Sequence, residues 1–452
     1  MAAPAGLTAP GARTETPYST RDTSPVAPPP GFGYRWSIVA LLFFATTINY
    51  VDRQVLGILA PTLQRELGWS EVDYGAIVSW FSLAYGFGLL GMGRLLDRIG
   101  VRRGLAFGVA AWSVAAMAHA LGRTAGGFSI ARAALGLGEA ANFPGAVKSV
   151  AEWFPKRERA LATGIFNAGS NVGAILAPLL VPFIALNWGW RWAFIVTGAL
   201  GFVWLAAWLA MYRAPERHPR LSAEELAYIR SDPAEGGGRV SWLRLLGHRQ
   251  TWAFVLGKCM TDPVWLFYLF WLPKFLDGSW GVKLAALAAP LIAIYVVADV
   301  GSVFGGWFSS ALIARGWSVN RGRKTAMFVA ALLIVPTALA PSAKSLWVAV
   351  AIVSVAAAAH QWWSANLFTL VSDLFPRRAV GSVVGIGGFC GAMVAMASQR
   401  ATGRLLEATG GDYHAIFAVC GFAYLAAFLL VHLLVPRMEP ARLDDPPRNE
   451  ES

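Results

Sequence analysis

The residues of this sequence that could do chemistry begin with an acid and a base side by side in an apolar stretch. Asp52 and Arg53 lie within a hydrophobic run from about Trp36 to Leu63. Each charge costs about 2.5–3.5 kcal/mol at the centre of a membrane helix on insertion scales, so such charges usually face a protein interior or a water-filled path. The pair therefore indicates a polar site inside a protein that crosses the membrane.

A second acid and base occur in a later apolar run. Arg132 and Glu139 are seven residues apart, or two helical turns, so both are expected on one face, with Asn142 near it. Two acids and two bases can form a neutral cluster, whose affinity for an anion changes when it gains or loses a proton. We expect Arg132 to hold an anion and Glu139 to titrate; a structural ion pair is the alternative.

Other polar side chains interrupt further apolar runs. Tyr50 and Tyr85 can offer hydroxyls to a polar ligand, with aromatic packing as the alternative for Tyr85. Asn167 and Asn171 are four residues apart and share a helix face. They can bind sugar hydroxyls or, alternatively, form hydrogen bonds between helices. A later alanine-rich run is interrupted by His360, Gln361, Trp363 and Asn366. A Trp beside amides is a suitable surface for a sugar-like ring.

A charged and kinked helix is predicted near residue 260. Lys258 and Asp262 are four residues apart and can neutralise each other. Pro263 interrupts the helix, and Trp265 follows. Asp299, in the next apolar run, has no evident partner in the sequence. The sequence assigns none of these residues a role.

Composition indicates the elements that must hold these residues. The chain has 452 residues, of which 56% are hydrophobic and only 14% charged, against about 25% charged in soluble domains. Apolar runs of about 18 residues or more recur, each long enough to cross a bilayer as a helix, and they do not alternate as strands of a barrel would. No catalytic triad or metal-ligand spacing stands out, so we expect no enzyme activity, cofactor or metal.

We expect an all-α membrane protein with twelve transmembrane helices. The basic residues gather in the loops after the second, fourth, eighth and tenth spans, which predicts that these loops and both termini are cytoplasmic; the net charge of +12 therefore does not indicate nucleic-acid binding. The predicted spans are about 37–60, 73–94, 104–122, 125–150, 159–184, 191–212, 251–275, 285–313, 325–341, 345–371, 379–403 and 413–435.

The spans divide into two halves. The predicted order is a disordered tail (1–35), a six-helix bundle (36–212), a polar linker (213–249), a second six-helix bundle (250–436) and a cytoplasmic tail (437–452). Within the linker, the stretch from Ser222 to Glu225 is typical of a capping box that opens a short surface helix, and a triple Gly at 236–238 is a flexible break.

The two halves resemble each other in sequence. The pairs Phe154-Pro155 and Phe375-Pro376 each precede basic residues and lie 375 − 154 = 221 residues apart. The basic loops near Arg98 and near Val319 are offset by the same amount. This pattern is typical of a parallel internal repeat, as in transporters whose two bundles rock about a site at the membrane midplane.

The loop from Gly93 to Arg103 resembles the signature of the major facilitator superfamily, Gly-x-Leu-x-Asp-Arg-x-Gly-x-Arg-Arg. The resemblance implies that Asp97 and Arg98 latch the two halves on the cytoplasmic side, which agrees with an interface closed by ion pairs and a helix dipole. The motif residues predicted for this cytoplasmic gate are Gly93, Asp97, Arg98, Gly100 and Arg102.

Four further stretches, 49–53, 136–144, 152–160 and 163–171, resemble the anion:cation symporter family and, within it, hexuronate transporters. The resemblance implies that Asp52 and Glu139 take up protons and that Arg53 and Arg132 serve the substrate carboxylate or the coupling network. The predicted substrate-binding residues are Tyr50, Arg53, Tyr85, Arg132, Asn142, Asn167, Asn171, Gln361, Trp363 and Asn366.

The sequence thus predicts a proton-coupled symporter of hexuronates or related sugar acids, a multi-pass, monomeric protein of a bacterial-type inner membrane. Its predicted partners are a small organic anion, protons and the lipid bilayer. Two alternatives stay open: the same fold moving another solute, such as an aromatic acid, a phosphate ester or a drug, or a membrane-embedded sensor or enzyme.

Overall fold

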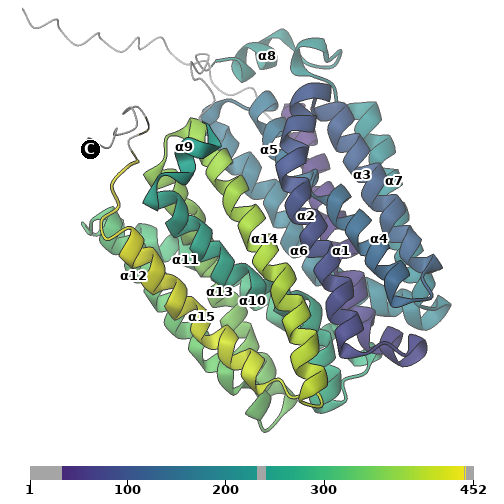
Figure 1. Ribbon diagram of the computed structural model, residues 1–452. Coiled ribbons are helices and arrows are strands. Elements are labelled where there is room, and N and C mark those ends of the chain that lie inside the picture. Colours follow the sequence, from purple (N-terminus) through teal and green to yellow (C-terminus); the bar gives the residue numbers. More distant parts are fainter. Residues whose placement is uncertain (1–32, 232–240, 442, 444–452) are drawn as a thin grey trace, which may run out of the picture.

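The computed structural model describes residues 33–231, 241–441 and 443, and within them all regular elements are helical. The predicted terminal tails and the triple Gly of the linker lie outside these residues, apart from the few next to the first and last helices. The long helices form two groups, α1–α7 and α10–α15, which stand side by side (Figure 1). The N-terminal half comprises α1 (Arg35–Leu67), α2 (Glu71–Ile99), α3 (Val101–Ala118), α4 (Ala125–Glu139), α5 (Asn142–Trp153), α6 (Lys156–Trp188) and α7 (Trp190–Met211).

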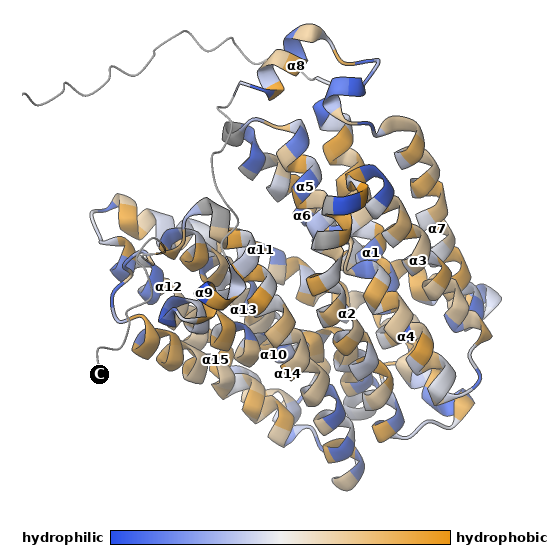
Figure 2. Ribbon diagram, turned by 45° about the horizontal axis from the view of Figure 1, so that its top comes forward, coloured by the Kyte–Doolittle hydropathy of each residue, from blue (hydrophilic) through white to orange (hydrophobic). Residues whose placement is uncertain are grey.

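Two short helices, α8 (Ala223–Ile229) and α9 (Trp242–Leu246), lie between the halves in the sequence. The C-terminal half comprises α10 (Arg249–Trp280), α11 (Ala288–Ala314), α12 (Val319–Ile334), α13 (Leu346–Leu374), α14 (Arg377–Ala408) and α15 (His414–Leu434), and a 3₁₀ segment, Val335–Ser342, extends α12. We call the end of the molecule that carries α8 and α9 the linker face and the other end the opposite face. Hydrophilic residues gather at the helix ends and around α8, whereas hydrophobic residues cover the helix lengths (Figure 2).

Twelve segments of the described residues cross the molecule, in agreement with the predicted fold class. Ten helical stretches of the described chain are long and apolar enough to span a membrane by themselves. The other two crossings are α1, which carries Asp52 and Arg53 near its middle, and the pair α4–α5. The span predicted at 125–150 corresponds to this one crossing, but its helix is interrupted at Ala140 and Ala141. Pro144 explains the break, because it has no N–H to bond the carbonyl four residues earlier.

The internal repeat is visible in matching helix ends. Phe154 ends α5 with φ −131° and ψ 138°, and Phe375 ends α13 with φ −124° and ψ 144°. The proline that follows each Phe is the N-cap of the next helix, α6 or α14. Thr124 and Ser345, 345 − 124 = 221 residues apart, both cap the first helix of their segment through the side-chain oxygen. The same offset therefore holds from the start of α4 to the start of α6.

Close packing within the N-terminal half depends on small residues of α4. A Cβ on Gly136 would lie 2.5 Å from the carbonyl oxygen of Phe81 in α2, and a Cβ on Gly138 would lie 2.7 Å from the backbone nitrogen of Trp112 in α3. Glycine thus allows α4 to lie against two neighbours at once, as small residues do between membrane helices. This contact fixes the height and rotation of Glu139, one residue further along α4.

The first part of the linker is docked on the N-terminal half. The Arg35 side chain, almost fully buried, donates to Glu158 of α6 at 3.0 Å and to Glu225 of α8 at 3.1 Å. The Ser222 hydroxyl accepts the Glu225 N–H at 3.1 Å, so the predicted helix start is confirmed. The Glu225 carboxylate, however, binds Arg35 rather than closing a capping box, so α8 is tied to the start of α1.

Candidate functional site between the two halves

The central feature of the site is an ion pair between two helices of the N-terminal half. Arg53 of α1 donates from Nε to the Glu139 Oε2 of α4 at 2.8 Å. Both side chains are buried, with 7% of Arg53 and 1% of Glu139 exposed. Such a pair is tolerated away from water because each charge has a well-oriented partner. The sequence suggested Arg132 as the structural partner of Glu139; in the structure that partner is Arg53.

Aromatic rings surround the Arg53 guanidinium. Its central carbon lies 4.8 Å from the ring centroid of Tyr50, 4.9 Å from Tyr85 and 5.1 Å from Phe81. Cation–π contacts of this kind contribute about 0.5–2 kcal/mol each when water is excluded. Tyr50 and Tyr85 are both half-buried. The two predicted tyrosines therefore lie beside the predicted base, and Arg53 is held in one orientation.

Arg132 lies behind this pair and is fully buried. Its Nη1 and Nη2 atoms donate to the backbone carbonyl of Arg53 at 3.1 and 3.2 Å. Its guanidinium is also 5.8 Å from the rings of Phe81 in α2 and Phe270 in α10. Arg132 thus connects α4 to α1 and touches the C-terminal half, so its geometry here is that of a brace between helices.

Asp52 points away from Arg53, into the N-terminal half. It is 2% exposed, and neither carboxylate oxygen has a hydrogen-bond partner among the described residues. Thr197 of α7 interacts with it, although that hydroxyl also lacks a hydrogen bond of standard geometry. A buried polar group without a partner is costly, and a charged one far more so. Asp52 and Glu139 therefore differ, since one is unpaired and the other is bound to a base.

The predicted asparagines of the N-terminal half fall into two kinds. The Asn142 amide donates to the Thr46 hydroxyl at 3.3 Å and is 4% exposed, so it ties α5 to α1. Asn167 is exposed and Asn171 is half-buried, both on α6, and the Asn171 side chain accepts from Ser170 at 3.3 Å. Of these three asparagines, only the pair on α6 has side chains that are exposed or half-buried.

In the C-terminal half, the predicted residues of α13 lie at different depths. Gln361 is half-buried. Trp363 is fully buried, with its ring 5.6 Å from that of Tyr424. Asn366 is 1% exposed, and its amide donates to the Gly305 carbonyl at 3.2 Å, which joins α13 to α11. Trp363 and Asn366 thus pack inside the C-terminal half.

The signature loop lies on the linker face. Gly100 has φ +79°, a value that favours glycine, and it joins α2 to α3. Arg102 donates to the Leu209 carbonyl at the end of α7 at 2.5 Å, and its own carbonyl accepts from the indole of Trp208. Arg98 is exposed; the side chain of Asp97 lies outside the described part. The described contacts of Arg102 are therefore made within its own half.

The two halves are joined at the opposite face by contacts that the sequence analysis did not include. Lys274 of α10 forms an ion pair with Glu71 of α2, and the Arg65 side chain pairs with Asp277 at 2.8 Å. Tyr74 donates to the Phe270 carbonyl at 2.5 Å. Polar residues near the short loops of this face were the available signal, but nothing in the sequence indicated which of them meet.

Among the residues whose side chains are described, contacts between the halves become fewer toward the linker face. Near the middle, the ring of Phe87 in α2 packs on Phe389 in α14, with centroids 5.4 Å apart. Beyond that level, a Cβ built on Gly91, Gly93, Gly381 or Gly385 would meet no described atom within 4 Å. The described contacts between α2 and α14 therefore gather at the opposite face and the middle, where Gly75 of α2 meets Gly403 of α14 and Arg400 bonds Ser79.

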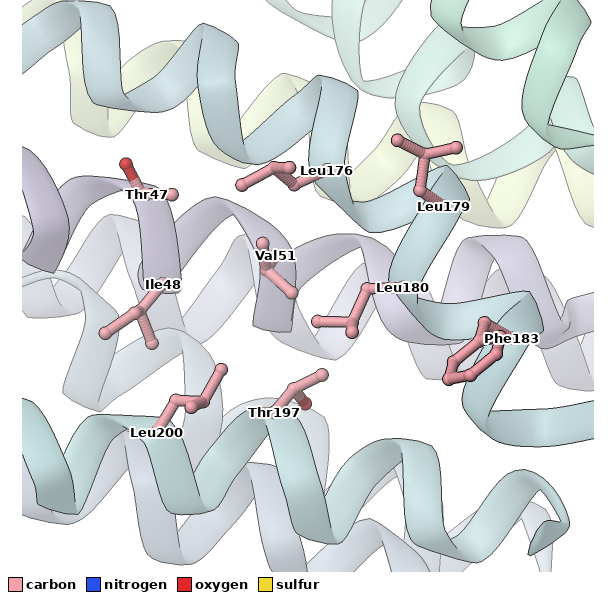
Figure 3. A pocket seen from close by; sticks show the side chains of 9 residues that line it. All are labelled: Thr47, Ile48, Val51, Leu176, Leu179, Leu180, Phe183, Thr197 and Leu200. Carbon is pink, nitrogen blue, oxygen red and sulfur yellow. The ribbon is translucent and has the colours of Figure 1, made fainter. Parts of the chain in front are cut away.

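An apolar pocket of about 440 Å³ lies within the N-terminal half, between α1, α6 and α7 (Figure 3). Its lining has no charged residue and only two hydroxyls, so it does not suit an anion. Thr197 links this pocket to the neighbourhood of Asp52. The lining residues are Thr47, Ile48, Val51, Leu176, Leu179, Leu180, Phe183, Thr197 and Leu200.

Two bundles of six crossings that are related by an internal repeat are typical of membrane transporters. The chain matches the family model of the Major Facilitator Superfamily over residues 42–398 and again over 310–452. It belongs to that superfamily, which confirms the resemblance of the signature loop, and it is a transporter rather than an enzyme.

Relatives in the superfamily carry informative names. The chain is 33% identical over 410 residues to the hexuronate transporter of Escherichia coli (strain K12), covering 89% of this chain and 93% of the relative. It is 34% identical over 310 residues to the galacturonate transporter of Dickeya chrysanthemi (67% and 90%). It is 30% identical over 425 residues to the probable galactarate/D-glucarate transporter GudP of Bacillus subtilis (89% and 92%).

Solved structures share the fold. The xylose transporter XylE from E. coli, in an inward open conformation, matches with a TM-score of 0.70 at 16% identity, covering 89% of this chain and 97% of that one. A bacterial homologue of the human lysosomal transporter Spinster matches with a TM-score of 0.67 at 18% identity, covering 89% and 96%. At these identities the likeness supports the fold alone.

Proposed function

We propose that this protein is a proton-coupled symporter that imports sugar acids, with hexuronates as the first candidates. The observation that carries the proposal is the Arg53–Glu139 pair, flanked by Tyr50 and Tyr85 and buried where the two halves meet. A guanidinium offers paired donors that suit a carboxylate, and tyrosine hydroxyls suit sugar hydroxyls. The names of the relatives agree with an anion of this class.

Coupling follows from competition for Arg53. In this structure the Glu139 carboxylate is paired with the Arg53 guanidinium. A proton on Glu139 removes that competing charge, so Arg53 becomes free to bind the carboxylate of the substrate. Loss of the proton restores the internal pair and expels the anion. Proton and substrate thus favour the same state, which is the differential affinity that symport requires.

Asp52 is proposed as the second proton-carrying acid. Its carboxyl is buried and unpaired, so the neutral form is the one that this environment accepts at lowest cost. Arg132 lies within electrostatic reach of Asp52 and braces the Arg53 backbone. A change of charge at Asp52 would therefore be felt at the substrate site through Arg132.

The contacts of the sugar are proposed to come from both halves. Asn167 and Asn171 on α6 and Gln361 on α13 are accessible side chains that can bond hydroxyls. Asn142, Trp363 and Asn366 are proposed to support the site from behind by holding helices together, because they are buried.

The conformation corresponds to release into the cytoplasm. The basic loops of the linker face favour a cytoplasmic orientation for that face and for both termini, in a bacterial-type inner membrane. With the opposite face closed by pairs such as Lys274–Glu71, the proposed release path leads past α2 and α14 at the linker face. Import then requires these outer contacts to open and the linker face to close in the other state.

The test is uptake of labelled galacturonate by proteoliposomes with an imposed pH gradient. Wild type should accumulate the substrate, and Glu139→Gln should bind it but lose most pH-driven accumulation. The matched control is Glu152→Gln, an acid of the same half whose carboxylate binds the Tyr212 hydroxyl at 2.7 Å near the linker face. Accumulation by Glu139→Gln equal to that of wild type would rule out the titrating role. A thermal-shift screen of sugar acids on purified protein identifies ligands independently, since bound ligands raise the melting temperature.

A further inference from the structure

Three residues of α10 form a stripe that is separate from the coupling residues proposed above. Lys258, Asp262 and Trp265 follow the spacing i, i+4, i+7, so they lie on one face of the helix. Their side chains stay partly accessible in the middle of a membrane-crossing helix, with 14% of Lys258 and 22% of Asp262 exposed. Charges in such a position usually face a protein interior or a water-filled path.

The stripe lies on a helix that packs against the N-terminal half. Helix α10 packs against α1, and Lys258 acts electrostatically on Tyr50, the residue that stacks on Arg53. The Lys258 ammonium lies 2.8 Å from the Asp262 carboxylate and 4.9 Å from the ring centroid of Phe368. An ammonium has three donors, so the bond to Asp262 leaves donors for another acceptor. Lys258 is therefore a cation that can bind a further acceptor, on a helix that packs against the helix of Arg53.

Trp265 is fixed as a flat surface beside this cation. Its ring stacks on His360 with centroids 4.7 Å apart and an angle of 6° between the planes. His360 is itself held by a hydrogen bond to the Tyr424 hydroxyl. The indole is half-buried, so part of it stays uncovered. An aromatic ring held in this way can pack against the carbon skeleton of a sugar acid.

We propose that this stripe is the share of the C-terminal half in the substrate site, and that Lys258 binds the end of the substrate remote from the carboxylate held by Arg53. Trp265 supports the carbon chain between the two ends, and Asp262 is a positioning residue that orients Lys258. The inference rests on the proposed function. It adds a substrate class: a sugar diacid, with a carboxylate at each end, uses both cations, whereas a uronate uses only one.

The experiment compares galactarate, a diacid, with galacturonate, a monoacid, in the same proteoliposomes. Lys258→Gln should raise the KM for galactarate at least tenfold more than the KM for galacturonate, and Lys258→Arg should restore most of the difference. Asp262→Asn should act in the same direction with a smaller effect. Trp265→Ala should weaken both substrates, and Trp265→Phe should weaken them less.

Several outcomes overturn the inference. If Lys258→Gln changes both KM values by the same factor, Lys258 does not bind the end of the substrate remote from Arg53. If Lys258→Gln fails to fold because Asp262 is left unpaired, the double variant Lys258→Gln/Asp262→Asn removes both charges and is measured instead; an equal effect on both acids again contradicts the proposal. If the wild-type protein neither binds nor transports a sugar acid, the proposed function is refuted as well. If both acids are transported and Lys258→Gln leaves the ratio of their KM values unchanged, only this inference is refuted.

Discussion

In the N-terminal half the acid and the base of the central pair come from two helices, whereas in the C-terminal half both come from one. Arg53 and Glu139 join α1 to α4, and both are buried. Lys258 and Asp262 are neighbours on α10 and are partly accessible. Breaking the first pair therefore removes a contact between two helices, while breaking the second removes a contact within one helix. The first arrangement suits coupling and the second suits recognition.

The internal repeat sharpens this comparison. The offset of 221 residues, which relates the caps Thr124 and Ser345, places Glu139 at 139 + 221 = 360, the position of His360. Glu139 meets the charged Arg53, whereas His360 meets the neutral hydroxyl of Tyr424 and the face of Trp265. Equivalent positions thus carry a charged pair in one half and an aromatic, hydrogen-bonded group in the other, so we expect proton coupling in the N-terminal half.

The largest effect should come from Arg53→Gln, which breaks the pair that joins two helices. Removing one partner of a buried pair costs about 3–5 kcal/mol because the other charge is left buried and unpaired. We expect a lower melting temperature and at least about a 100-fold loss of transport, as such an energy implies. The double variant Arg53→Gln/Glu139→Gln should recover the melting temperature but not transport; recovery of both would show that the pair is only structural.

A smaller effect is expected from Lys274→Gln at the opposite face. Lys274 is 6% exposed and pairs with Glu71, whose side chain is 29% exposed. A hydrogen bond to a charged group contributes about 1.5–3 kcal/mol, so its loss should shift the equilibrium toward opening at this face by roughly tenfold or more. The measurement is labelling, by a membrane-impermeant maleimide, of a cysteine placed at Ser79.

Ser79 is a suitable reporter because it is buried and its hydroxyl accepts from Arg400 at 3.0 Å across the interface. The three native cysteines are first replaced by alanine. The control is the same Ser79→Cys reporter with Lys274 intact. Equal labelling rates in the two proteins would show that this ion pair does not hold the face closed.

His360→Gln tests the other side of the comparison and should have a modest effect. It removes the hydrogen bond to Tyr424 and the stacking partner of Trp265, at a cost of about 1 kcal/mol for the hydrogen bond. We expect a slightly lower melting temperature and an unchanged pH dependence of accumulation, measured in proteoliposomes beside Glu139→Gln. A flattened pH dependence would place part of the coupling in the C-terminal half.

The sequence was sufficient for features that depend on local pattern. The apolar runs predicted the crossings, and the Phe-Pro pairs predicted the repeat. The spacing of seven residues predicted that Arg132 and Glu139 lie on the same helix. The break after Glu139 could have been inferred from Pro144, whose effect is local.

Features that depend on how helices are rotated against each other could not be predicted. Glu139 binds Arg53 rather than Arg132 because glycines of α4 set its packing against α2 and α3. Asp52 and Arg53 are adjacent in the sequence, yet they face different parts of the N-terminal half. Lys274 and Glu71 are about two hundred residues apart, and no local signal relates them.

The smallest effect should come from Arg65→Gln, which shares the opposite face with Lys274 but not its burial. The Arg65 side chain is 54% exposed, and its partner Asp277 also binds Lys283 at 3.0 Å. Exposed pairs contribute about 0.2–1 kcal/mol, and Asp277 keeps a second base when Arg65 is removed. Labelling of the Ser79→Cys reporter should therefore rise less than twofold, and salt should reproduce the change in wild type because exposed charges are screened. An effect as large as that of Lys274→Gln would mean that closure depends on the total charge of this face, and the contrast between buried and exposed pairs would then not account for gating.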